Sequence, residues 1–180
     1  MLRDRFDQLM IIALLAVLAF AAVLMVGAGP REDSRGAKAV NRQLERDILH
    51  QARADFIERH YSPVIALRNS GSLPDALLKL EELSRTLPGE AHNDLLSGDI
   101  LLRMGHFDRA LSKLATAVRR NADYVDAVSP LSQRPLIESA VSEGLPLIRD
   151  RLRVQPENRT LAQVLKDGYY LKSRLAGGGE

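Results

Sequence analysis

The chain begins with a long apolar run, and the rest alternates apolar and polar positions with the period of a helix. Residues 9–28 contain no charged or strongly polar residue over 20 positions. As a helix at about 1.5 Å per residue this run spans about 30 Å, the thickness of a bilayer core. A cleaved signal peptide usually has an apolar stretch of about 7–15 residues. We therefore expect an uncleaved single-pass transmembrane helix, rather than a signal peptide cut after Ala28 or a buried soluble helix.

The flanks of the apolar run leave its orientation open. Residues 1–8 form a short tail, and residues 29–37, with two glycines and a proline, suit a linker. Two arginines precede the run and three basic residues follow it closely, so the count that sets topology is nearly tied. We expect the tail inside and the remaining chain on the periplasmic side of a bacterial inner membrane. A domain on the cytoplasmic side is the alternative.

Residues 38–61 predict a long amphipathic helix that connects the anchor to the rest of the chain. Its apolar side chains recur at intervals of four, which drift slowly around a helix. These residues are Val40, Leu44, Ile48, Ala52 and Phe56. We expect this face to pack on the remaining chain, or against a second protomer in a homo-oligomer. Ser62 and Pro63 then resemble an N-cap and a first-turn proline, which predict the start of a new helix.

Two segments that lie 34 residues apart match position by position: SGSLPDALLKL at 70–80 and MGHFDRALSKL at 104–114. In the second copy, apolar residues from Ala110 to Val118 fall on one face of a helix, and the first copy repeats this pattern from Ala76. A glycine-containing turn precedes each of these helices, and in the second copy another apolar helical stretch precedes the turn. The unit is therefore helix, turn, helix, with copies over residues 57–90 and 91–124.

This unit resembles the tetratricopeptide repeat (TPR) family, which has the same 34-residue period. The family has a small residue in the first helix, a glycine and an aromatic residue at the turn, and small and large apolar residues in the second helix. The matching positions are Gly71, Ala76, Leu80, Gly98, Gly105, Phe107, Ala110, Leu114 and Ala117. Asp94 departs from the pattern, since the family often has Trp there. The resemblance implies an all-α solenoid.

The last part of the chain predicts a weaker repeat and a cap, within a repeat domain over residues 62–176. A third copy over 125–158 is degenerate, because prolines fall in its first helix; alternatively, Leu145-Pro146 starts a short helix. Thr160 and Gln163 match a capping box that opens a helix over 160–175, which caps the stacked repeats. Asn158 and Thr160 also match a glycosylation acceptor, but helix capping explains them more simply. We expect residues 177–180 to be disordered.

Composition excludes several classes of function. There are 25 Lys and Arg against 23 Asp and Glu, 4% aromatic residues, no Trp and no Cys, which argues against nucleic-acid stacking, thiol chemistry and cysteine metal sites. His50 and His60 lie about 15 Å apart along one helix, too far to share a metal ion. His92 and His106 suit the surface. We find no catalytic motif, and expect a binding protein without cofactor or metal.

The resemblance to TPR proteins implies a concave groove, lined by the first helices of the repeats, that binds a segment of a partner protein. The groove positions are His92, Leu95, Asp99, Leu102 and Arg103. Leu95 and Asp99 stand where TPR proteins that clamp chaperone carboxylates have Lys and Asn, so we expect no carboxylate clamp.

Two hypotheses for the function stay open. The first is a membrane-anchored adaptor or scaffold that helps a membrane or envelope complex to assemble or mature. Similar architectures occur among bacterial cytochrome c maturation subunits and companions of the protein-export channel. The alternative is an accessory subunit permanently packed in a larger membrane complex.

Overall fold

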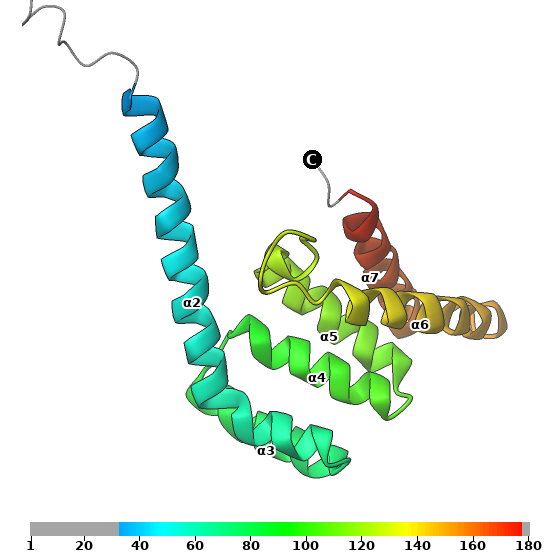
Figure 1. Cartoon of the computed structure of the whole chain (residues 1–180). Coiled ribbons are helices and arrows are strands. Elements are labelled where there is room, and N and C mark those ends of the chain that lie inside the picture. The colour runs from blue at the N-terminus through cyan, green and yellow to red at the C-terminus, as the bar shows by residue number, and fades with distance from the viewer. Residues whose placement is uncertain (1–32, 178–180) are drawn as a thin grey trace, which may run out of the picture. The chain divides into compact units, whose positions relative to one another are not determined.

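The computed structural model describes residues 33–177, and every element in this part of the chain is a helix (Figure 1). The elements are α2 (Asp33–Asn69), α3 (Leu73–Thr86), α4 (Ala91–Arg103), α5 (Phe107–Arg120), the short 3₁₀ helix η1 (Ala122–Tyr124), α6 (Arg134–Val154) and α7 (Arg159–Ala176). The all-α prediction is confirmed. The transmembrane helix predicted over residues 9–28 lies outside the described residues. No helix within residues 33–177 has the length and apolar content needed to cross a membrane.

The 34-residue period is present in the backbone. Helices α3 and α5 both contain 14 residues, and both the first and the last residue of α5 follow those of α3 by 34 positions. The turns before them match as well: Gly71 and Gly105 have φ angles of 83° and 76°, a conformation that glycine adopts without strain. The amide of Ser72 donates to the Leu67 carbonyl at 3.0 Å, and that of His106 to the Leu101 carbonyl at 2.9 Å. The chain is therefore repeat-like as well as helical.

Small residues lie where the helices of a copy approach each other. Ala110 and Ala117 of α5 are fully buried, as are Leu111 and Leu114. A Cβ atom added to Gly98 of α4 would lie 2.6 Å from the Leu114 side chain, closer than two carbon atoms can approach. The small residue in the first helix therefore sets how closely α4 packs on α5.

The third copy keeps only its second helix. Residues 125–133 are not helical, and α6 then runs through 21 residues without a turn, so Leu145-Pro146 lies inside a helix and does not start one. Pro146 is exposed, so the carbonyl that its missing N–H leaves free can bond to water. Gly144 and Ile148 follow Ala110 and Leu114 by 34 residues and are likewise buried. The second half of α6 thus continues the register of α3 and α5.

Helix α2 continues through Ser62 and Pro63, so the prediction of a new helix there is wrong. Pro63 lies on the exposed side of α2, whereas Tyr61 and Val64 are fully buried against α3 and α4. This packing holds the helix straight through the proline at the loss of one hydrogen bond. The last 13 residues of α2, from 57 to 69, precede those of α4 by 34 positions. The first copy therefore shares its first helix with the connecting segment.

The chain divides into two units, Met1–Ile48 and Leu49–Glu180. The second unit has two apolar clusters, one among α2, α3 and α4 and one around α5, and α4 contributes to both. Helix α5 packs against α4, α6 and α7. The predicted C-terminal helix is present as α7, but Asn158 is its N-cap: the Asn158 Oδ1 accepts from the Leu161 amide at 3.1 Å. The Thr160 capping box is therefore wrong.

Candidate functional site

A cavity of about 510 Å³ opens within the second unit, between the second half of α2, the start of α4 and the loop after η1. Its α2 residues recur every three or four positions, so they occupy one face of that helix. Its lining residues are Ala54, Ile57, Glu58, Ser62, Ile65, Ala66, Asn69, His92, Tyr124, Pro130, Leu131 and Gln133. Apolar side chains predominate, with a few polar groups among them, which is typical of a binding cavity. We call it the α2–α4 cavity.

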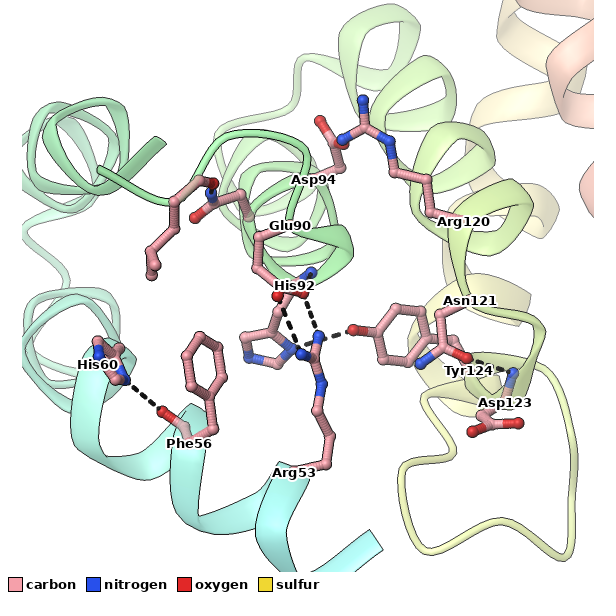
Figure 2. A network of polar contacts seen from close by, with 12 residues as sticks. Arg53, Phe56, His60, Glu90, His92, Asp94, Arg120, Asn121, Asp123 and Tyr124 are labelled. Atoms are coloured by element: carbon pink, nitrogen blue, oxygen red, sulfur yellow. Dashed lines mark hydrogen bonds and ion pairs between the residues drawn. The ribbon is translucent and has the colours of Figure 1, made fainter. Parts of the chain in front are cut away.

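An ion pair joins α2 to the start of α4 beside this cavity. Figure 2 shows the Arg53 guanidinium reaching towards Glu90, between His92 and Tyr124. Arg53 Nη1 donates to Glu90 Oε2 at 2.9 Å, and Nη2 donates to Oε1, which makes the pair bidentate. Glu90 is also the N-cap of α4, because its carboxylate accepts from the His92 amide at 3.3 Å. The hydrogen bond to Arg53 lowers the pKa of Glu90, and the reciprocal bond raises that of Arg53.

His92 lies among aromatic side chains and is 7% exposed. Its Nδ1 lies 3.4 Å from the Tyr124 hydroxyl, and the Tyr61 ring packs against it nearly edge to face at 4.8 Å. Burial lowers the pKa of His92 to about 4, so its imidazole is neutral at neutral pH. Burial also raises the pKa of Tyr61 and Tyr124. The wall of the cavity near His92 is therefore uncharged and aromatic.

Two polar atoms of this aromatic group lack a hydrogen-bond partner within residues 33–177: His92 Nε2 and the Tyr61 hydroxyl. A buried polar group without a partner costs about 1–3 kcal/mol. Native proteins keep few such groups, and those that they keep often lie at sites with a functional role. These atoms, together with the cavity, make this region the candidate site.

Three buried aspartates hold the helices around the site in place. Asp94 binds Lys113 at 2.9 Å and Arg120 at 2.5 Å, both on α5, so the position at which TPR proteins often have Trp carries an ion-pair link between α4 and α5. Asp167 links α7 to α5 through Arg119 at 2.6 Å. The third, Asp99, is described with the predicted groove below. Each charge is paired, as a buried carboxylate requires.

The five residues predicted to line a groove differ in their surroundings. His92 lines the α2–α4 cavity. Leu95 is 2% exposed and lies in the core, and Leu102 packs partly buried against it. Asp99 is 4% exposed and accepts from Arg68 at 2.6 Å and from Arg103 at 2.8 Å. Of the five, the structure therefore brings only His92 to the α2–α4 cavity.

Sequence reasoning missed most of the residues that line the cavity. Ile57 and Ile65 were assigned to helices without a role, although the apolar spacing along α2 is a signal for a shared face. Tyr124, Pro130 and Leu131 come from η1 and the loop after it, where no periodic pattern marks them. Among residues 33–177, no group of three or more His, Asp or Glu could hold a metal ion. No protein-family model and no solved structure matches the chain.

Proposed function

We propose that this protein is a membrane-anchored, TPR-like adaptor that holds a segment of a partner protein in the α2–α4 cavity. The observation that carries this proposal is the cavity itself: it is mostly apolar and lies against a buried, neutral histidine. It also lies along the first helices of two helix–turn–helix copies, the face on which the resemblance to TPR proteins implies partner binding.

The lining suits a segment that inserts an apolar side chain and offers a hydrogen-bonding group. Ile57, Ile65 and Leu131 provide apolar contact, and Ser62, Asn69 and Gln133 provide amide and hydroxyl groups for the backbone of the segment. The Arg53–Glu90 pair ties α2 to α4 beside the cavity. Because less ordering is then needed on binding, a cavity held in this way binds more tightly than a flexible one.

A photo-crosslinking experiment with the full chain in native membranes tests the adaptor. A photoreactive amino acid at Ser62, which lines the cavity, should give one crosslinked partner, and the same probe at Leu78, an exposed residue of α3 outside the lining, should not. Adding Ile65→Arg to the Ser62 probe should abolish the product. Equal crosslinking from both positions, or a product that survives Ile65→Arg, would argue against the cavity as the binding site.

The adaptor would act at a bacterial inner membrane, held by residues 9–28, in the assembly or maturation of an envelope complex. We place the repeat domain on the periplasmic side, with the cytoplasmic side as the alternative. Protease added to intact spheroplasts should digest the domain if it is periplasmic. Digestion only after the spheroplasts are broken would establish the cytoplasmic side.

The second candidate function, an accessory subunit packed permanently in a larger complex, is favoured by an apolar face on α2. Leu44, Ile48 and Leu49 are 56%, 58% and 63% exposed. Such a face suits contact with another chain. Replacing residues 9–28 with an unrelated membrane anchor separates the candidates: an adaptor should keep its activity, whereas a subunit that packs through this segment should leave its complex.

A further inference from the structure

A second cavity, of about 430 Å³, lies between α6 and α7, on elements that do not line the α2–α4 cavity. Val141, Leu145 and Leu175 provide its apolar contacts, and Tyr169, Arg149 and Lys172 also line it. Tyr169 is 48% exposed, an unusual exposure for a large ring. The α6–α7 cavity therefore combines an apolar lining, an exposed phenol ring and two basic side chains.

The positive charge in the α6–α7 cavity is not neutralised by its neighbours. Lys172 forms no ion pair with any residue of the described chain, and the one ionic contact of Arg149 is to adjacent Asp150 at 3.7 Å, longer than a hydrogen bond. The carboxylate in the lining, Glu138, is already bound by Arg134 at 2.8 Å. Two cationic groups are thus available to a ligand.

The same charge extends over the surface of α7. Between Arg134 and Gly177 there are eight Lys and Arg against five Asp and Glu. The single acidic residue of α7, Asp167, is buried and bound to Arg119. Arg159, Lys166 and Arg174 are exposed on α7. An anionic partner would therefore be attracted to this end of the domain.

We propose that the α6–α7 cavity docks a segment of a partner protein in which an apolar side chain lies next to a carboxylate. The apolar side chain contacts Val141, Leu145 and Tyr169, and the carboxylate accepts hydrogen bonds from Arg149 and Lys172. Carboxylates at Glu138, Glu143 and Asp150 alternate with the cations along α6. A uniformly anionic lipid surface would be repelled by them, whereas a segment with one or two acidic groups can avoid them.

The test measures binding of a dye-labelled synthetic peptide that alternates leucine and glutamate to the full chain in detergent micelles. We expect this peptide to bind, and a matched peptide with lysine for glutamate not to bind. Arg149→Ala combined with Lys172→Ala should weaken binding by about tenfold or more. The matched control, Arg159→Ala combined with Lys166→Ala, removes two exposed charges outside the cavity and should leave the affinity unchanged. Ser142→Glu, which adds a carboxylate to the lining, should also weaken binding.

Three outcomes would overturn the proposal. The first is no binding of the acidic peptide, and the second is an equal affinity of both peptides. The third is an equal loss in both double variants, which would assign the effect to net charge. Phosphatidylglycerol vesicles provide the remaining comparison. If they bind the full chain through Arg149 and Lys172 while the peptide does not, the ligand is a lipid surface and the protein-segment proposal is wrong. Circular dichroism of each variant verifies that it is folded.

Discussion

The burial of His92 links the candidate site to acid stability. Its pKa falls from 6.5 to about 4 on folding, because burial disfavours the charged imidazolium. Between these values the unfolded chain binds more protons, so stability is complete above pH 6.5 and falls as the pH drops through this window. The loss from this group amounts to about 2 kcal/mol between pH 6.5 and pH 5.

Urea unfolding of residues 33–180 at several pH values measures this effect. His92→Gln should flatten the pH dependence between pH 6.5 and pH 5. His60→Gln is the matched control, because His60 is exposed on α2. If the slope is the same in the His92 variant as in the parent chain, His92 is not the group that titrates.

Ala110 tests how closely the second copy is packed. The side chain is fully buried on α5, at a position that the repeat pattern reserves for a small residue. Ala110→Leu should lower the free energy of unfolding by about 1–3 kcal/mol through overpacking. Arg109→Leu, at the exposed neighbouring position, should change it little. A tolerated leucine at 110 would show that the helices can separate here without cost.

At the scale of elements, the Arg53–Glu90 pair joins α2 to α4 across the edge of the α2–α4 cavity. The pair is bidentate and its side chains are 26% and 18% exposed, so solvent screens it only partly. Arg53→Gln and Glu90→Gln should each cost about 1–2 kcal/mol, and the double variant should cost less than their sum. Thermal unfolding measures this double-mutant cycle.

An exposed pair provides the control for the double-mutant cycle. Arg85 and Glu81 lie one turn apart on α3, with side chains 77% and 65% exposed. Arg85→Gln should cost less than about 0.5 kcal/mol, since exposed pairs contribute little. Additive losses at Arg53 and Glu90 would mean that the two residues act independently, and that the pair does not couple the helices.

The elements also show what local patterns predict well. The 34-residue period predicts the turns at Gly71 and Gly105 and the helices after them, because each depends on residues close in sequence. Helix α2 runs through Pro63 because of burial at Tyr61 and Val64, which depends on α3 and α4. The α2–α4 cavity likewise needs the loop at 125–133, whose position follows from tertiary packing. Local signals therefore predict repeats better than they predict boundaries and sites.

At the scale of the whole molecule, the distribution of buried residues predicts a gradient of local stability. Helix α5 packs against α4, α6 and α7, and six of its 14 residues are buried. In contrast, residues 44–49 of α2 are exposed, with Leu44 and Ile48 more than half exposed. Local opening is easiest where few apolar contacts must be broken. Amides of α5 should therefore exchange with solvent most slowly, and those of residues 44–49 among the fastest.

Hydrogen exchange followed by mass spectrometry measures this gradient in the full chain, and it also tests what covers the apolar face of α2. If residues 44–49 exchange rapidly at all concentrations, the face is free in the isolated protein, as an adaptor requires. Protection that increases with protein concentration would indicate a homo-oligomer formed through α2, because mass action favours association. Protection in native membranes that is lost on purification would instead favour the accessory subunit, since a partner chain must then cover Leu44 and Ile48.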